Sequence, residues 1–565
     1  MEFALNKGRR TANTDIYRRV VSLCSSLVRP GRILSISLHG LRAMGYEERG
    51  LGLDVLMVLG WKRRGIGRYI RHVDGEDVHI LTVDSGLLKL DLRWSLLGDC
   101  LSERLFMPYI PLVGADLLRK WEVRLKKRIV LEALEELVWE SPELAHELLI
   151  HPEYFIHEYI NRRSLLRPPT FQQFLKMLAK DVRKRNIDAI MAGFTQAIKE
   201  LADEGWVRPS DKYLRVGRRL LARGSGTPIP HMAKLAIKRT ARLLMNLNPW
   251  VLQHQLYEWL VCTRRGRPAD TPQPSRLEDS RSYLYLEVGF GQVSLSDDTT
   301  LEGFVRRFYP GAETHVQRIG WFLACTYLLT LERNGETHRV VVKNFGEEEG
   351  LKWIPVAFWA LGAKRFAILG WARMRREYVA TRLLRRHGVP APEILYMSPR
   401  RLLLFKEYIE GRNLAEIVKE IALRGNPTQE ERLLMRKAGR LIARIHQLGI
   451  TLGDCKPENI MVDRSGELHI VDLEQAAPEG DCAWDLAEFV HFLAFYTPVS
   501  TTPPFLPPVG TLAELAKEFL KGYVEGGGSK SVVKKIFSPK YTRVLTLLVP
   551  HSTGLLAMLS RKLED

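Results

Sequence analysis

Four polar side chains with a characteristic spacing lie between residues 445 and 474. An amphipathic run ends before a loop that holds Asp454, Lys456 and Asn459, and a short apolar run then ends at Asp472. Phosphoryl transfer uses this set of groups: one carboxylate orients the attacking hydroxyl, a lysine offsets phosphate charge, and an amide and a second carboxylate hold Mg²⁺. The spacing therefore predicts a phosphotransferase site in which Asp454 and Lys456 are catalytic and Asn459 and Asp472 bind the metal.

This segment resembles the catalytic loop and the D-F-G motif of protein kinases. Upstream, the apolar run 339–343 ends in Lys343, similar to the V-A-I-K strand, and Glu377 lies in a predicted helix over 374–386. The resemblance implies that Lys343 binds the α- and β-phosphates of ATP and that Glu377 holds this lysine in place. The expected phosphate loop is poor in glycine, because it offers only Gly320.

The strand-like run 402–405 leads into Glu407-Tyr408-Ile409-Glu410-Gly411, which looks like the hinge between two kinase lobes. The resemblance implies that the backbone of Glu407 and Ile409 binds adenine. It covers residues 296–565 and predicts a bilobal kinase-like fold, with an N-lobe over 296–408 and a C-lobe over 409–565.

Departures from the kinase motifs indicate a particular branch. Leu452 and Gly453 replace the His and Arg of H-R-D, Glu474 replaces the Gly of D-F-G, and no activation loop fits between Asp472 and Asp485. These features are similar to atypical kinases such as the RIO kinases and the small KEOPS-complex kinase. The resemblance implies that Asp485 braces the catalytic loop. Because Glu474 lacks the freedom of glycine at φ > 0, we expect no switching by a flip of this motif.

The sequence predicts an ATP- and Mg²⁺-dependent kinase, most simply a protein serine/threonine kinase acting on a protein substrate. A small-molecule phosphotransferase is an alternative, because aminoglycoside-kinase-like folds share the G-D-x…N loop, whereas the retained Lys456-Pro457-Glu458 favours the protein-kinase side. A further alternative is an ATP-switched binding module or ATPase without protein kinase activity, which the sparse phosphate loop would suit.

The net charge of +19 is distributed unevenly along the chain. Residues 1–290 hold 47 Lys and Arg against 33 Asp and Glu, an excess of about +14. A basic half of this kind is typical of proteins that bind RNA or another polyanion, although a solvated basic surface would look the same. No apolar run is long enough for a membrane span, and the first residues lack the apolar core of a signal peptide, so we expect a cytoplasmic protein with no membrane partner.

Composition predicts a multidomain α+β protein. Residues 263–282 combine proline, charge and small polar side chains, which is typical of a linker, and we place the linker at 263–295. Before it, residues 1–115 are predicted as a small α/β domain and residues 116–262 as a helical domain. A helix ending near Leu201, followed by a short hairpin with basic residues, suggests a winged helix in this second part.

The first domain faintly resembles the nucleotidyltransferase fold, which carries two metal-binding carboxylates two residues apart on a strand. Gly52 stands at the first of these positions, so only Asp54 remains, with Asp91 in a predicted strand over 87–92 as a candidate third carboxylate. Two-metal chemistry requires paired carboxylates, so we expect a degenerate fold used for binding, or an unrelated α/β domain.

Overall fold

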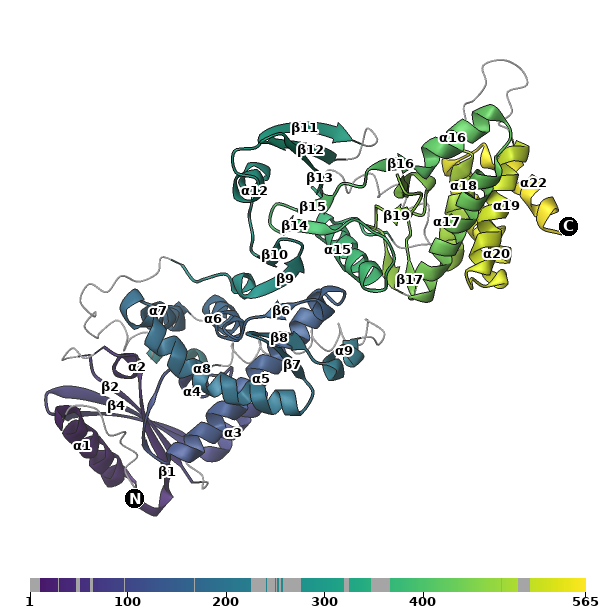
Figure 1. Cartoon of the computed structure of the whole chain (residues 1–565). Coiled ribbons are helices and arrows are strands. Elements are labelled where there is room, and N and C mark those ends of the chain that lie inside the picture. The colour runs from purple at the N-terminus through teal and green to yellow at the C-terminus, as the bar shows by residue number, and fades with distance from the viewer. Residues whose placement is uncertain are drawn as a thin grey trace. The chain divides into compact units, whose positions relative to one another are not determined.

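The computed structural model describes residues 11–28, 30–46, 51–60, 65–95, 97–166, 168–224, 240, 249, 251–253, 256–257, 276–319, 325–346, 366–478, 480–495 and 509–564. The chain forms two compact units, residues Met1–Tyr285 and Leu286–Asp565, and each is described by itself (Figure 1). Among the described residues no helix is both long enough and apolar enough to cross a membrane.

The first unit begins with a five-stranded mixed sheet in the order β3-β4-β2-β1-β5. β2 pairs in parallel with β4, and the other neighbours are antiparallel. Apolar side chains of α1, among them Val20 and Cys24, pack with Ile36 and Met57 of the sheet to form its core. The elements are α1 (Thr11–Leu27), β1 (Ile33–His39), α2 (Gly40–Ala43), β2 (Leu53–Leu59), β3 (Ile66–Val73), β4 (Glu76–Asp84) and β5 (Ile110–Val113).

The strand predicted over 87–92 is wrong, because these residues lie in helix α3 (Ser85–Trp94). The Asp84 side chain accepts from Gly86 N and caps the helix, and Leu88 and Leu92 are buried at helical spacing. A short apolar run fits a buried strand or a buried helix face equally well, so periodicity alone could not separate the two.

Helices α4 to α8 follow, and α5 and α8 lie side by side (Figure 1). Lys126 of α5 is buried between Glu122, at 2.6 Å, and the carbonyl oxygen of Ile190 in α8, at 2.7 Å. Gly193 permits this approach, because a Cβ there would lie 2.2 Å from the Glu122 carboxylate. The helices are α4 (Glu103–Phe106), α5 (Ala115–Glu140), α6 (Tyr154–Leu166), α7 (Pro168–Met177) and α8 (Lys180–Asp203).

Helix α8 leads directly into a two-stranded hairpin, with Asp211 at a positive φ of 54° in the turn. Strand β8 of the hairpin also pairs with a third short strand, β6. The winged helix stays a prediction. The elements are β6 (Leu149–Ile150), β7 (Val207–Ser210), β8 (Tyr213–Val216) and α9 (Arg218–Gly224). The predicted division at residue 115 falls inside one compact unit, because α5 also packs on β1, β5 and α3.

The second unit opens with a five-stranded antiparallel sheet in the order β11-β12-β13-β15-β14 and one long helix, α15. Asn334 and Gly335, both at positive φ, form the two-residue hairpin turn between β12 and β13. The segment predicted as linker up to residue 295 contains β9 and β10. The elements are β9 (Leu284–Val288), β10 (Gly291–Ser294), α12 (Leu301–Phe308), β11 (Glu313–Ile319), β12 (Thr326–Arg333), β13 (Glu336–Asn344), α15 (Gly370–Arg386), β14 (Ile394–Ser398) and β15 (Leu403–Glu407).

The rest of the second unit is mainly helical around one apolar core. Helices α17 and α19 approach closely at Gly439, where a Cβ would lie 2.0 Å from the carbonyl oxygen of Phe519. Short strand pairs precede α18 and carry the loops of the candidate site. The elements are β16 (Gly411–Asn413), α16 (Leu414–Arg424), α17 (Gln429–Gln447), β17 (Ile450–Thr451), β18 (Ile460–Asp463), β19 (Leu468–Ile470), β20 (Ala477–Pro478), α18 (Cys482–Leu493), α19 (Val509–Glu525), α20 (Lys530–Lys535), α21 (Pro539–Leu548) and α22 (Ser552–Glu564).

Candidate active site

The loop between β17 and β18 is held by one buried carboxylate, that of Asp485 in α18. Its two oxygens accept from Leu452 N at 2.6 Å and from Gly453 N at 2.7 Å. His446 Nε2, at the end of α17, lies 3.0 Å from the same carboxylate. Asp485 is fully buried, so the loop backbone just before Asp454 is fixed from inside the helical core. The structure thus places Asp485 where the sequence predicted a brace.

His446 is held in its charged form by this arrangement. Burial alone would lower its pKa, but the hydrogen bond to Asp485 and the neighbouring Cys482 outweigh it and raise the pKa from 6.5 to about 9. Its other ring nitrogen, Nδ1, lies 3.0 Å from the Tyr523 hydroxyl. The ion pair with Asp485 therefore stabilises the fold fully below pH 6.5, and this contribution is lost as the pH rises through 9.

We expect the unfolding free energy of the chain to fall by up to about 3 kcal/mol between pH 6 and pH 9.5 through this pair. His446→Gln cannot carry the charge, so this part of the pH dependence should vanish in that variant. Urea unfolding of both chains at the two pH values measures the difference. An identical pH dependence in both chains would contradict the assignment.

Three predicted catalytic-loop side chains lie together. Lys456 Nζ lies 2.6 Å from Asp454 Oδ1. Asn459 Nδ2 donates to the carbonyl oxygen of Asp454 at 2.8 Å and to its Oδ2 at 3.2 Å. Burial lowers the pKa of Lys456, but Asp454 and Glu488 raise it above its usual value, so this lysine remains charged. The loop thus presents a carboxylate with a cation and an amide beside it.

A second cluster forms around Lys343 at the end of β13. Its Nζ lies 2.9 Å from Glu377 Oε2 in α15, 2.8 Å from Asp472 Oδ1 and 3.0 Å from Glu474 Oε2. Burial opposes the charged form of Asp472, but Lys343 outweighs it and holds the pKa of this carboxyl well below its usual range. Asp472 is therefore a carboxylate at neutral pH, as a metal ligand must be.

Two cations in this cluster were missed from the sequence. Lys406 Nζ in β15 donates to Glu377 Oε1 and to the carbonyl oxygen of Val471. Arg373 in α15 is fully buried and lies 3.3 Å from Glu474 Oε2. Arg373 and Glu377 are four residues apart on a helix, and that spacing was a signal for a shared face. Three cations thus balance the carboxylates of Glu377, Asp472 and Glu474.

The two clusters are joined through the backbone, because Val471 N donates to the carbonyl oxygen of Asn459 at 3.1 Å. This bond brings the segment that follows β19 and holds Asp472 beside the catalytic loop. Oxygen atoms of Glu377, Asp472 and Glu474 lie within 4.8 Å of one another. Carboxylate and amide oxygens are the donors that Mg²⁺ prefers, so the side chains of Asn459 and Asp472 fit this metal.

The remaining predicted nucleotide-binding residues are placed as follows. Glu407 ends β15, and its N donates to the carbonyl oxygen of Glu393 at 2.8 Å while its carboxylate accepts from Glu393 N at 3.0 Å. Its side chain is therefore engaged beside β14. Ile409 lies in the segment between β15 and β16 and is half-buried. Gly320 lies outside the described residues.

Among its described residues, the first unit does not assemble a metal site around Asp54 and Asp91. The Asp91 carboxylate is fully buried and accepts from four backbone N–H groups, at distances of 2.9 to 3.2 Å, so its oxygens are already used. It anchors the turn after α3, and its prediction as a third metal ligand is wrong. Asp54 lies against Gly40, where an added Cβ would lie 2.2 Å from its carboxylate. The donors of the turn are Leu97, Asp99, Leu101 and Ser102.

Comparison with known proteins matches part of this chain to kinases. The sequence model of the lipopolysaccharide kinase (Kdo/WaaP) family matches residues 361–487, which include Glu377, Asp454, Asn459 and Asp472. The chain is 31% identical over 103 residues to the KEOPS complex subunit Bud32 of Pyrococcus abyssi, covering 18% of this chain and 44% of that protein. The second unit contains a kinase-like domain.

Plant protein kinases are also similar to part of this chain. CBL-interacting protein kinases 21 and 1 of Oryza sativa subsp. japonica are 27% and 29% identical over 106 residues. Each match covers 19% of this chain, and 20% and 22% of the two relatives. The chain thus spans less than half the length of these relatives. The kinase-like resemblance predicted from the sequence is confirmed, and the comparisons support a phosphotransferase.

Proposed function

We propose that the second unit is an ATP-dependent protein serine/threonine kinase of the atypical type. The observation that carries this proposal is the contact of Lys343 with both Glu377 and Asp472, next to a catalytic loop braced by Asp485. Strand β13, helix α15 and the segment that follows β19 thereby hold a cation where ATP phosphates would bind. A buried lysine shared by carboxylates from two other segments, α15 and residues 472–474, fits this use.

Each residue then has a defined part in the reaction. Asp454 accepts the hydrogen bond of the attacking hydroxyl and orients it, and Lys456 offsets the charge of the transferring phosphate. Lys343 binds the phosphates of ATP and is kept in place by Glu377. Asn459 and Asp472 would hold Mg²⁺, which supplies charge neutralisation at the phosphates when bound.

The contacts of Asp472 and Glu474 support a site whose activity is not switched by a flip of the motif that these residues form. Glu474 N donates to Asp472 Oδ1 at 3.2 Å, and the Glu474 side chain is held by Lys343 and Arg373. The chain continues directly into β20 and α18 without a long intervening segment. We infer that turnover is controlled by a protein substrate or partner, which the basic first unit would recruit.

A small-molecule phosphotransferase is the second candidate function. The match to a family described as lipopolysaccharide kinases favours it. The retained Lys456-Pro457-Glu458 string and the matches to protein kinases favour a protein acceptor. An ATP-switched module without transfer is the remaining alternative.

Transfer of labelled γ-phosphate from ATP with Mg²⁺ should distinguish these functions. We expect label on serine or threonine of a generic protein acceptor such as casein, and no such label with Asp454→Ala. Lipopolysaccharide core sugar serves as the competing acceptor. Label on the sugar alone would overturn the protein-kinase proposal in favour of the second candidate, and binding of ATP with no transfer to either would overturn both.

A further inference from the structure

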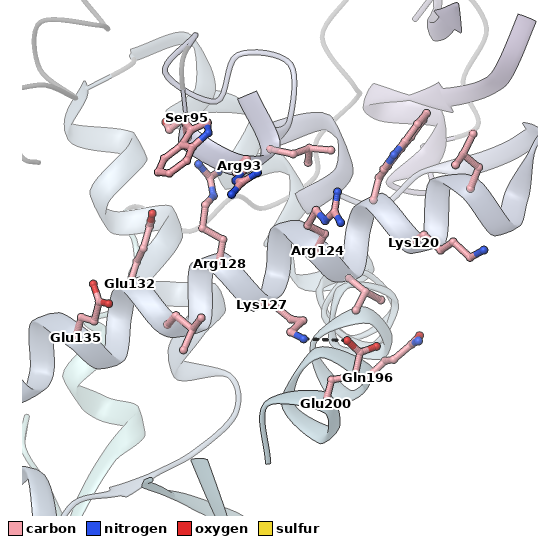
Figure 2. A pocket seen from close by; sticks show the side chains of 16 residues that line it. Arg93, Ser95, Lys120, Arg124, Lys127, Arg128, Glu132, Glu135, Gln196 and Glu200 are labelled. Atoms are coloured by element: carbon pink, nitrogen blue, oxygen red, sulfur yellow. Dashed lines mark hydrogen bonds and ion pairs between the residues drawn. The ribbon is translucent and has the colours of Figure 1, made fainter. Parts of the chain in front are cut away.

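The first unit has an open groove of about 1040 Å³ along helix α5 (Figure 2). The end of α3, helix α5 and one face of α8 line it. Its floor includes the buried side chain of Trp121, and its rim carries Arg93, Lys120 and Arg124. Glu132 and Glu135 lie toward the other end of α5. The groove thus combines an apolar floor with a basic half.

The three rim cations have no ion pair or hydrogen bond with any residue that the structure describes. Other basic side chains of the groove do have such partners: Lys127 lies 3.1 Å from Glu200, and Arg128 donates to the carbonyl oxygen of Asp91 at 3.3 Å. Arg93, Lys120 and Arg124 are all exposed. Lys120 and Arg124 are four residues apart on one helix face, about 6 Å along the axis, which is close enough to serve neighbouring phosphates.

An exposed indole stands next to one of these cations, Arg93. The Trp94 side chain is 66% exposed, and the Arg93 guanidinium lies 5.1 Å from its ring centroid. The next residue, Ser95, is only 2% exposed, and its hydroxyl has no hydrogen-bond partner among the residues that the structure describes. A large exposed ring and a buried unpaired hydroxyl in one wall of a groove both indicate a missing ligand.

The position of Trp94 is fixed rather than incidental. Ser95 takes a left-handed conformation at φ 54°, which ends α3 and turns the chain after the indole. The Asp91 carboxylate then collects the backbone N–H groups of the turn, including that of Leu97 at 2.9 Å. This turn is itself buried at Leu101 and Ser102, so the end of α3 that carries Trp94 is held by the core of the unit.

We infer that this groove binds single-stranded RNA. Unpaired cations attract phosphates, and an exposed tryptophan stacks on an unstacked base. A duplex offers no free base face along its length, whereas RNA loops and ends supply unstacked bases that aromatic and arginine planes recognise. Arg93, Lys120 and Arg124 supply the positive charge that phosphates would contact along the groove.

The inference concerns the first unit and does not rest on phosphotransfer by the second. Binding of a fluorescein-labelled, mixed-sequence 12-nucleotide RNA to the full chain, followed by anisotropy at several salt concentrations, tests it. We expect Lys120→Glu with Arg124→Glu to weaken binding at least tenfold and to reduce the slope of log K against log salt by about 1. Trp94→Ala should weaken binding about tenfold, and Trp94→Phe should restore most of it.

The matched control is Lys180→Glu with Lys184→Glu, two exposed lysines with the same spacing on α8 and outside the groove. This control changes the net charge equally and should cost less than threefold. Equal losses for the two double variants would overturn the inference in favour of diffuse attraction, as would unchanged binding by Trp94→Ala. Equal or tighter binding of single-stranded DNA or duplex RNA of the same length would overturn the assignment to single-stranded RNA.

Discussion

Asp454→Ala is expected to lower the rate of γ-phosphate transfer by about 10²- to 10⁴-fold, because it removes the carboxylate that orients the attacking hydroxyl. Asp454 is held by Lys456 and Asn459, so the substitution removes one side chain from an otherwise ordered loop. Binding of ATP should remain, since the phosphates contact Lys343 rather than Asp454 in the proposed site. The steady-state rate of transfer of labelled phosphate to the acceptor measures the loss of activity.

Asp298→Asn is the control for this prediction. Asp298 is an exposed carboxylate of the same unit, with an ion pair to Arg401 at the surface, and lies outside both site clusters. Its replacement should leave the transfer rate within about twofold of the parent chain. If Asp454→Ala retained more than a tenth of the parent rate, Asp454 would not be the carboxylate that orients the attacking hydroxyl.

Asp485→Ala is expected to reduce both stability and turnover. The substitution leaves the N–H groups of Leu452 and Gly453 buried without an acceptor and removes the partner of the charged His446. Unsatisfied buried groups of this kind cost about 1–3 kcal/mol each, so we expect a loss of about 3–5 kcal/mol in the free energy of unfolding. Urea unfolding and the transfer rate measure the two effects.

The same helix offers a matched control. Asp481 caps α18 by accepting from Ala483 N at 3.2 Å, and it also accepts from Lys540 Nζ and the Tyr541 hydroxyl of α21, each at 2.6 Å. Asp481→Ala should therefore cost about 1–3 kcal/mol while leaving turnover unchanged. At a temperature where both variants are folded, Asp485→Ala should transfer phosphate at least tenfold more slowly than Asp481→Ala. Equal rates would show that the loop does not depend on this brace.

The site residues that lie close together in the sequence could be predicted from it. Asp454, Lys456 and Asn459 lie in one loop, so their spacing alone defines their relation, and the structure brings them together. Lys343 and Glu377 required the kinase resemblance, because they meet only when β13 and α15 pack in the folded unit.

Residues that act through tertiary contacts were not predictable in this way. Lys406 looks like an ordinary strand lysine, and Arg373 like a surface arginine of a basic helix, until the sheet and α15 bury them against Glu377 and Glu474. Asp91 was misplaced for a related reason: its short apolar neighbourhood fits a strand or a helix. The four backbone donors that occupy it come from a loop without a sequence signature.

The most direct test of the central claim is equilibrium binding of MgATP to the full chain, measured by calorimetry for the parent, Asp454→Ala and Asp472→Asn. If Lys343 and Asp472 form a nucleotide and metal site, the parent and Asp454→Ala should bind MgATP alike. Asp472→Asn should bind MgATP at least tenfold more weakly than the parent. The affinity of this variant for ATP should differ little between a buffer with Mg²⁺ and a buffer with EDTA. Equal MgATP affinity in all three chains would contradict the assignment of this cluster as the active site.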